Sequence, residues 1–326
     1  MSKIIIQNGN MCELDLPLKF AQKLYNEFAI RHPNAFYLRT RQRGMQNWDG
    51  KIHYITKTGQ FKIGLLPKVY DMCIEMGIKP KVVDMRQPLP KVSKVVTNIG
   101  KYKLRPEQEK AVKSVINNRV GDTPFHIGVL DYTVNAGKTL IMSSLYLTYK
   151  KQLKTLLITN DSDWLNQARE EFKQYLPGED ITFVQGKVLN WSNFTIGMVQ
   201  SISRNMRFYQ KELSQIDMVL VDEADQGGSK QYQNVITRLF NTRIRIGLSG
   251  TIYMSKLAKD KVKNMNLECF FGKVIAEFKL KDSIKKGYST KTIVKMVPGK
   301  PWYGNWESDC ISYKEIYDDS ITENNT

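Results

Sequence analysis

Two short segments of the chain carry side chains whose types and spacing suit phosphate and metal binding. The first, residues 133–139 (Thr-Val-Asn-Ala-Gly-Lys-Thr), follows an apolar run and opens an amphipathic stretch. Backbone N–H groups in such a loop can surround phosphate oxygens at the start of a helix. Lys138 would then reach the β- and γ-phosphates of a nucleotide, and the Thr139 hydroxyl would bind Mg²⁺. The loop residues expected to bind the nucleotide are Asn135, Ala136, Gly137, Lys138 and Thr139.

The second segment is the acidic sequence Asp222-Glu223-Ala224-Asp225, which ends an apolar run beginning at residue 218. The first segment alone does not match the common Gly-x-x-x-x-Gly-Lys-Thr pattern, because Tyr132 stands where that pattern has its first Gly. The acidic segment supplies the second, independent indication of a nucleotide site. At the carboxyl end of a strand, Asp222 can hold Mg²⁺ while Glu223 orients and activates the attacking water. Together the segments predict an ATP site that uses Mg²⁺, with Lys138, Asp222 and Glu223 as its catalytic residues.

These segments need a scaffold that brings a loop and a strand end together, and the pattern beyond residue 100 predicts one. Short β-branched runs alternate there with amphipathic stretches, which is typical of a parallel sheet with crossover helices. We therefore expect an α/β domain. The predicted strands are 125–131, 154–159, 181–185, 194–199, 217–222 and 243–249, and the predicted helices are 106–118, 138–150, 161–175, 208–214 and 230–239.

The residues before this domain predict a small, separate α+β domain. Apolar residues four apart indicate a helix over 16–30, and a second short helix is expected near 67–77. Residues 79–100 contain three prolines among Lys and Val, which is typical of a linker. The predicted division is 1–98 for the small domain, 99–272 for the ATP-binding domain, and 273–326 for a linker and the start of a further lobe.

Positive charge is concentrated in the small domain. The 326-residue chain has 49 Lys or Arg and 32 Asp or Glu, for a net charge of +17, and residues 1–100 hold 16 of the basic and 7 of the acidic side chains. Residues 31–68 carry eight basic side chains and one acid, with aromatic residues between them. Such a block favours nucleic acid as a partner, because neutralised phosphates release counterions. The alternative is a generally basic protein surface.

The densest part of this block is residues 36–55. Arg39, Arg41 and Arg43 recur at every second position, which on a strand would place all three on one face to meet successive phosphates. A turn is expected at 47–50, followed by a second strand. Trp48 could stack on a base or fill the core beneath the hairpin. The residues proposed to contact DNA here are Arg39, Arg41, Arg43, Trp48 and Lys51.

Other classes of protein are weakened by composition. No apolar run approaches the roughly 20 residues that a membrane-spanning helix needs. The four cysteines are far apart and form no Cys-x-x-Cys pair, so a disulfide framework or zinc site is not expected. A cytoplasmic protein without a membrane partner is the prediction.

The order of the motifs resembles that of superfamily 2 helicases. Leu104-Arg105-Pro106-Glu107-Gln108, the loop at 133–139, the literal DEAD sequence at 222–225 and Ser249-Gly250-Thr251 follow one another as in that family. The resemblance implies a RecA-like P-loop lobe, the first of two motor lobes. It also implies that Gln108 reads the adenine with Arg105 beside it, and that Ser249, Gly250 and Thr251 couple nucleotide state to the DNA track. Val199-Gln200-Ser201 resembles a segment that contacts the nucleic-acid backbone, through Gln200.

Within the superfamily, the basic segment at 41–52 followed by this motor resembles phage recombination and branch-migration helicases. That resemblance implies an ATP-dependent DNA helicase acting on forks, R-loops or Holliday-type junctions in recombination and repair, in the cytoplasm of a bacterial host. Duplex, forked or branched DNA would be the partner. The alternatives are a duplex DNA translocase that does not separate strands, a DEAD-box RNA helicase, and a non-catalytic DNA-binding module.

Motors of this superfamily hydrolyse ATP between two RecA-like lobes, and the second lobe supplies arginines that stabilise the transition state. No Gln-x-x-Gly-Arg-x-x-Arg motif follows residue 251. We therefore expect a fragment of a longer helicase, with low ATPase activity unless a second lobe is supplied in cis or in trans. The oligomeric state is left open.

Overall fold

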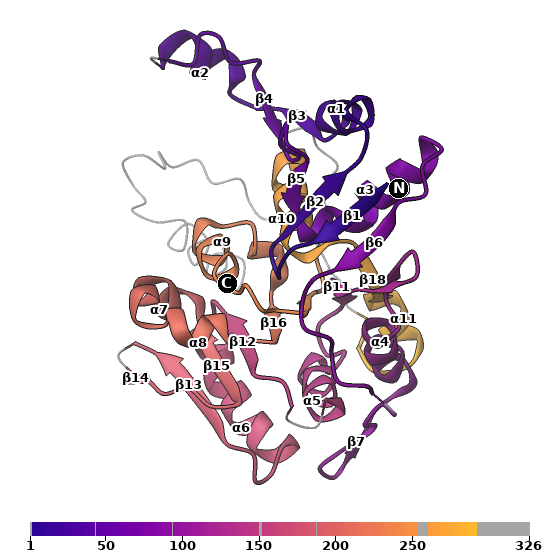
Figure 1. Ribbon diagram of the computed structural model, residues 1–326. Coiled ribbons are helices and arrows are strands. Elements are labelled where there is room, and N and C mark those ends of the chain that lie inside the picture. Colours follow the sequence, from indigo (N-terminus) through magenta and orange to yellow (C-terminus); the bar gives the residue numbers. More distant parts are fainter. Residues whose placement is uncertain are drawn as a thin grey trace, which may run out of the picture. The chain divides into compact units, whose positions relative to one another are not determined.

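From residue 126 onward, buried strands alternate with helices and build one large sheet (Figure 1). The computed structural model describes residues 2–291, except 43, 93, 150, 151, 187 and 253–259. Met1–Tyr288 forms one compact unit. The predicted tail at 301–326 lies outside the described residues, and so does most of the predicted start of a further lobe.

The large sheet has eight strands in the described part of the chain, and seven of them run parallel. The short edge strand β14 is antiparallel to its neighbour. The four central strands β12, β16, β17 and β11 are buried along their whole length, as expected for a parallel sheet covered on both faces. In spatial order the strands are β14 (Val188–Leu189), β13 (Ile181–Gln185), β15 (Phe194–Met198), β12 (Thr155–Thr159), β16 (Met218–Asp222), β17 (Ile244–Ser249), β11 (His126–Tyr132) and β18 (Val274–Phe278).

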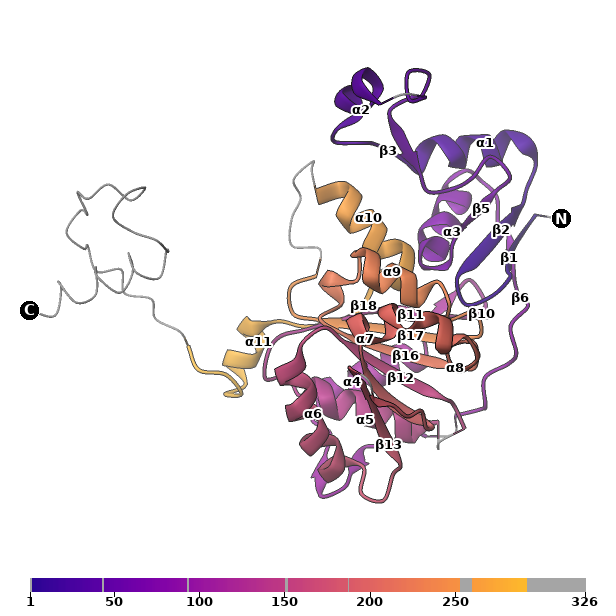
Figure 2. The same cartoon turned by 90° about the vertical axis from the view of Figure 1, so that its left-hand side faces the viewer.

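Helices cover both faces of this sheet (Figure 2). Successive residues of a strand point to opposite faces, so Leu157 and Leu220 join one apolar layer and Ile158 and Val221 the other. The first face is covered by α4 (Pro106–Ile116), α5 (Lys138–Thr148) and α6 (Ser162–Tyr175), and the second by α7 (Val199–Arg204), α8 (Gln210–Ser214), α9 (Lys230–Ile236) and α10 (Asp260–Phe271), while α11 (Leu280–Lys285) follows β18.

The predicted α/β class is confirmed for this RecA-like lobe. Each predicted strand begins and ends within one residue of an observed strand. The predicted end of the lobe at residue 272 is too early, because β18 lies beyond it and pairs in parallel with β11. The strand β18 is only partly buried and includes the exposed Glu277, so its sequence lacks the continuous apolar run of the central strands.

The N-terminal residues form a second, mixed sheet with helices beside it, which confirms the predicted α+β architecture. Its strand order is β5-β2-β1-β6, with the β1–β6 pair parallel and the other pairs antiparallel. The elements are β1 (Lys3–Ile6), β2 (Met11–Asp15), α1 (Leu18–Glu27), β3 (Ala29–Arg31), α2 (Ala35–Arg41), β4 (Lys51–His53), β5 (Gln60–Lys62), η1 (Ile63–Leu65), α3 (Leu66–Glu75) and β6 (Lys81–Asp84).

The predicted linker at 79–100 is partly wrong, because β6 belongs to the N-terminal sheet. Lys3 pairs with Lys81 and Ile6 with Asp84. A parallel partner more than 70 residues away leaves no local signal in the sequence, and the flanking prolines dominate the pattern. After β6, short ladders β7 (Asn98–Ile99) with β8 (Tyr102–Lys103) and β9 (Arg119–Val120) with β10 (Thr123–Pro124) flank α4.

The predicted arginine strand is also wrong. Arg39 and Arg41 lie on the helix α2, where residues two apart project about 200° apart and do not share a face. The partner of β4 is β3, so residues 32–50 form an insertion between the two strands of this hairpin. Without a neighbouring strand to accept its backbone hydrogen bonds, the segment satisfies them internally as a helix. Arg43 lies outside the described residues.

The N-terminal domain and the lobe share one hydrophobic core. The Tyr54 hydroxyl donates to Asn266 Oδ1 at 3.0 Å, and the Lys68 ammonium lies 2.8 Å from a Glu268 carboxylate oxygen on α10. Gly64 packs against the same helix, since a Cβ there would lie 2.1 Å from the Glu268 carbonyl oxygen. The domains proposed from the sequence are thus packed together within one unit.

Three of the cysteines, Cys12, Cys73 and Cys269, are free and buried, while Cys310 lies outside the described residues. Burial raises the pKa of the Cys73 thiol to about 11 and that of Cys269 to about 12, so both are protonated at neutral pH. Among the described residues, no helix has the length and apolar character that crossing a bilayer requires.

Candidate active site

The phosphate loop, residues 133–139, connects the carboxyl end of β11 to α5. Two of its residues have left-handed backbone conformations, Asn135 with φ 63° and Gly137 with φ 74°. Gly137 directly precedes the first helical residue, Lys138. A chain bent in this way at a helix N-terminus presents successive N–H groups to an anion, as in known phosphate-binding loops. The local geometry therefore supports phosphate binding despite Tyr132 in place of the usual first Gly.

The loop is held by the two residues assigned to the adenine by resemblance. Gln108 is fully buried, and its Nε2 donates to the Ala136 carbonyl at 2.8 Å while its Oε1 accepts from the Arg105 N–H at 2.9 Å. The Arg105 guanidinium donates to the Asn135 carbonyl at 3.2 Å. In this structure both side chains therefore support the phosphate loop, and their contact with adenine stays a prediction.

Replacing Gln108 with Ala should loosen the phosphate loop. The change leaves the Ala136 carbonyl and the Arg105 N–H without their partner, at a cost of about 1–3 kcal/mol for a buried unsatisfied group. We expect a lower urea midpoint and weaker binding of a fluorescent ATP analogue. Gln152→Ala, at an exposed position, is the matched control. Equal stability and nucleotide affinity of the Gln108 and Gln152 variants would contradict this role.

The acidic segment, residues 222–225, begins at the carboxyl end of β16, which is two strands from β11. Asp222 is 3% exposed, and its Oδ1 lies 3.4 Å from the Lys138 Nζ. The pKa of Asp222 is raised by burial, and the Lys138 ammonium opposes that rise. Burial and the neighbouring carboxylates of Asp222 and Asp225 also raise the pKa of Glu223. The fold thus brings together the loop and the acids that the sequence predicted.

The acidic segment is electrostatically unbalanced in a way that suits a divalent cation. The buried Asp222 Oδ1 accepts no hydrogen bond from any described residue. Three carboxylates lie within four residues, and Lys138 is the cation in ion-pair contact with Asp222. Mg²⁺ favours carboxylate, hydroxyl and phosphate oxygens. Asp222, with Thr139 at the start of α5, therefore fits the metal that the fold class implies.

Ser249, at the end of β17, joins the acidic segment to the next loop. Its hydroxyl donates to Asp225 Oδ1 at 2.9 Å and accepts from the Thr251 N–H at 3.2 Å. Gly250 lies against the phosphate loop, since a Cβ at this position would be 3.1 Å from the Thr133 Cα. The residues predicted to couple nucleotide state to DNA therefore contact both halves of the nucleotide site.

A chain of side-chain amides runs from Gln200 to the acidic segment. Gln200 Nε2 donates to the backbone carbonyl of Asn160 at 3.3 Å, and the side-chain Nδ2 of Asn160 donates to Gln226 Oε1. Gln226 Nε2 in turn lies 3.5 Å from a Glu223 oxygen. Asn160 lies within residues 159–167, which resemble a helicase segment that contacts the nucleic-acid backbone, whereas sequence reasoning did not identify Gln226. Their signal was available, because both follow the carboxyl ends of predicted parallel strands, where ligand sites form.

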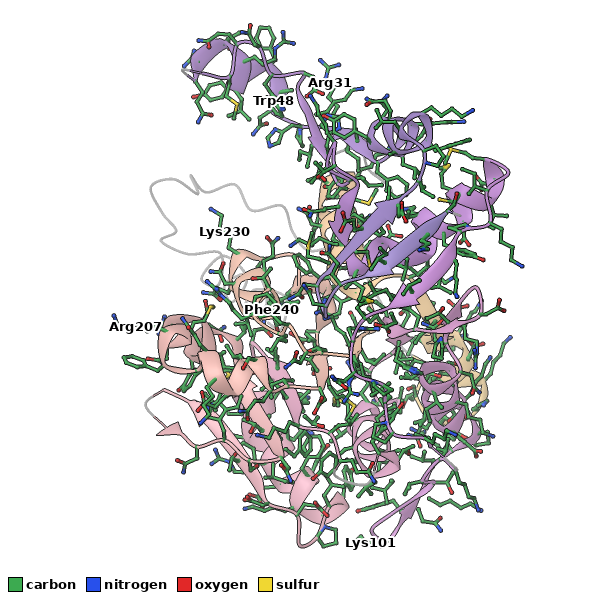
Figure 3. All side chains as sticks on the ribbon, viewed as in Figure 1. Arg31, Trp48, Lys101, Arg207, Lys230 and Phe240 are labelled. Atoms are coloured by element: carbon green, nitrogen blue, oxygen red, sulfur yellow. The ribbon has the colours of Figure 1, made fainter. Side chains whose placement is uncertain are left out.

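The remaining predicted DNA contacts among the described residues lie in the N-terminal domain on residues 29–53, which we call the β3–β4 arm. Trp48 is partly exposed rather than part of the core, and its Nε1 donates to the Lys51 carbonyl at 3.0 Å. Its ring also makes an edge-on contact with His32, with 5.7 Å between ring centroids. Arg39 and Arg41 are exposed on α2. The arm therefore gathers these residues away from the nucleotide site, as Figure 3 shows for Trp48.

Replacing Arg39 and Arg41 with Gln should flatten the salt dependence of DNA binding. Each lost phosphate contact lowers the slope of log K against log salt by about 0.9 for duplex DNA. DNA-binding titrations at salt concentrations from about 50 to about 200 mM measure this slope. Lys79→Gln with Lys81→Gln removes the same charge elsewhere on the domain and serves as the control. An unchanged slope would show that the two arginines only face solvent.

The sheet order, the phosphate loop and the acidic segment together define a P-loop lobe that resembles the first motor lobe of superfamily 2 helicases. A sequence model of the family described as "Type III restriction enzyme, res subunit" matches residues 101–254. The chain is also 22% identical over 228 residues to the ATP-dependent DNA helicase uvsW of Enterobacteria phage T4. That alignment covers 63% of this chain and 43% of the relative, which is less than half of the relative's length.

Two solved structures share the fold. The crystal structure of the UvsW helicase from bacteriophage T4 matches with a TM-score of 0.65 at 22% identity, covering 85% of this chain and 99% of that chain. A second structure of T4 UvsW matches with a TM-score of 0.64 at 20% identity, covering 84% of this chain and 56% of that one. These matches confirm the predicted fold, and the chain resembles UvsW in both sequence and structure.

Proposed function

We propose that this chain is the ATP-binding and DNA-binding part of an ATP-dependent DNA helicase. The observation that carries the proposal is the contact between Lys138 and Asp222, which joins the phosphate loop to the acidic segment at one edge of the sheet. The resemblance of the sequence motifs to phage recombination and branch-migration helicases extends the proposal to branch migration on forks, R-loops or Holliday-type junctions, in recombination and repair within an infected bacterial cell.

Each residue of the site has a role in this proposal. Lys138 and the loop N–H groups bind the β- and γ-phosphates, and Thr139 with Asp222 holds Mg²⁺. The metal, when bound, neutralises charge on the phosphates. Glu223 takes a proton from the attacking water. Ser249 lies between the acidic segment and Thr251, so a shift of Asp225 is passed on to that loop.

A second RecA-like lobe, in cis or in trans, is part of the proposal. Hydrolysis in this class of motor depends on arginines that the facing lobe places on the transferred phosphoryl group, and related arginines contribute about 10³–10⁵ in rate. ATPase measurements with and without such a lobe test the requirement. Rapid, DNA-stimulated hydrolysis by residues 1–326 alone would contradict it.

The second candidate is translocation along duplex DNA without strand separation. It is favoured by the family match at residues 101–254, whose description is that of a restriction enzyme subunit. Two assays distinguish the helicase from the translocase: strand displacement on forked DNA and triplex displacement on duplex DNA. ATP-dependent strand displacement supports the helicase, and triplex displacement alone supports the translocase.

The nucleic acid itself is tested by competition at fixed salt, because phosphate contacts dominate affinity. RNA, single-stranded DNA, duplex DNA and a four-way junction compete for one labelled fork. Preference for the junction or fork supports the proposal. Preference for RNA would instead favour an RNA helicase.

A further inference from the structure

Helix α2 stands out from the rest of the N-terminal domain. It is carried by the β3–β4 arm and projects from the molecule in both ribbon views (Figures 1 and 2). Of its seven residues only Ala35 is buried. A helix this short gains little stability from its own hydrogen bonds. Its exposed side chains are available to contact a partner.

The exposed surface of α2 is aromatic and cationic at once. Phe36 is 79% exposed and Tyr37 is 56% exposed. The Arg41 guanidinium lies over the Tyr37 ring, 5.2 Å from its centroid. Because both rings are exposed to solvent, the fold does not gain the hydrophobic free energy that burying them would provide. Exposed aromatic and apolar groups beside charges are typical of binding surfaces.

The surroundings of α2 are suited to an anionic partner. A cavity of about 400 Å³ lies beside the helix and is lined by Arg31, Phe36 and Arg39 among others. Asp49 also lines this cavity, 2.7 Å from His53 Nε2, and this hydrogen bond lowers the Asp49 pKa, so the carboxylate keeps its negative charge. Along the sequence, residues 31–68 contain eight basic side chains and this one acid.

We propose that Phe36 and Tyr37 form a wedge that stacks on unpaired bases where the strands of a DNA fork separate. Aromatic rings bind bases by stacking without regard to sequence, and arginines hold the adjoining phosphates. Bases inside a duplex have both faces covered by their neighbours, whereas a base at a strand junction has a free face. The wedge rests on the proposed DNA-motor function and gives it a preference for forks.

The position of α2 agrees with this assignment. Figure 3 shows Arg31 and Trp48 at the base of the helix, with Lys230 and Arg207 on the same side of the lobe. Arg207 lies over the ring of Phe208, which is 62% exposed, at 4.8 Å from its centroid. A second exposed cation–aromatic pair therefore follows α7, the helix that carries the predicted backbone contact Gln200.

The test compares binding of the 326-residue chain to a fork, a duplex and a single strand, without ATP. We expect Phe36→Ala with Tyr37→Ala to weaken fork binding about tenfold or more, as lost base stacking does, and to leave duplex affinity nearly unchanged. With 2-aminopurine at the first base pair of the fork, the wild-type chain should change its fluorescence and the double variant should not. Circular dichroism checks that the variant is folded.

Two further variants make the test specific. Phe36→Leu with Tyr37→Leu keeps apolar side chains but removes the rings, so it should lose the fork preference too, and retention of that preference would overturn stacking. Leu18→Ala, at an 87% exposed position of the same domain, should change nothing. If the wild-type chain binds no DNA, the proposed function fails. If the alanine variant still prefers forks, or changes only self-association, the wedge alone is wrong.

Discussion

Replacing Lys138 with Ala is expected to lower ATP hydrolysis at least about a hundredfold in a protein that contains this chain together with a second lobe. Loss of a single group that stabilises developing charge commonly costs 10²–10³ in rate, as an order of magnitude. Lys138 would contribute both to phosphate binding and to neutralising the buried Asp222, 3.4 Å away. ATPase rates with and without forked DNA, together with titration of a fluorescent ATP analogue, measure the effect.

Lys110→Ala is the matched control for this prediction, since Lys110 is exposed on α4 and is not part of the phosphate loop. It should hydrolyse ATP at the wild-type rate. The two variants also distinguish the motor from a DNA-binding module whose nucleotide site is only structural. If DNA remodelling survives Lys138→Ala, the chain is not the motor that we propose.

Replacing Arg245 with Ala is expected to destabilise the protein by about 2–5 kcal/mol, through lost hydrogen bonds and a buried cavity. Arg245 lies on β17 and is fully buried. Its guanidinium donates to the Gly9 carbonyl at 2.6 Å, to Asn10 Oδ1 at 2.8 Å and to the Phe270 carbonyl at 3.1 Å. Burial lowers its pKa to about 9, so the side chain stays charged at neutral pH.

These contacts join the turn between β1 and β2 to the lobe. The Gly9 N–H donates to the Phe240 carbonyl at 2.6 Å, and a Cβ on Gly9 would lie 2.6 Å from the Leu239 carbonyl oxygen. Arg245→Ala leaves three acceptors without their donor where the two domains meet. We therefore expect the loss to appear in both domains in one urea transition.

Urea unfolding followed by tryptophan fluorescence and circular dichroism measures the loss. Arg238→Ala, at an exposed position of the same lobe, should fall within about 0.5 kcal/mol of wild type. Arg245→Lys keeps the charge but cannot donate in three directions with the planar geometry of a guanidinium, so it should lie between the two. An Arg245→Ala midpoint equal to that of Arg238→Ala would show that the turn is held by packing alone.

The lobe was predictable because its strands are buried on both faces. Runs such as Met218–Val221 are entirely apolar, so the pattern is strong and its ends are sharp. The phosphate loop and the acidic segment follow two of these runs directly. In parallel sheets the carboxyl ends of the strands share one edge, so the meeting of Lys138 with Asp222 could be expected from order alone.

The N-terminal domain was less predictable because its interactions are not local. The strand β6 pairs with β1 across most of the domain, and α2 is a helix because no strand lies beside it. Alternation of Arg39 with Arg41 does not distinguish a strand from an exposed helix when neither face is buried. The same uncertainty covered Trp48, which proves to be half-buried against the arm rather than in the core.

The sequence by itself determined the fold of the lobe and the residues of its candidate nucleotide site, because both depend on short segments whose types and order suffice. Only the tertiary structure decided that the buried Gln108 side chain hydrogen-bonds to the phosphate loop. It also decided that Arg245 on β17 donates to Gly9 in the turn between β1 and β2. It also decided that Phe36 and Tyr37 are left in water. Burial and exposure depend on which distant residues pack together, and the identity of a residue does not specify its neighbours.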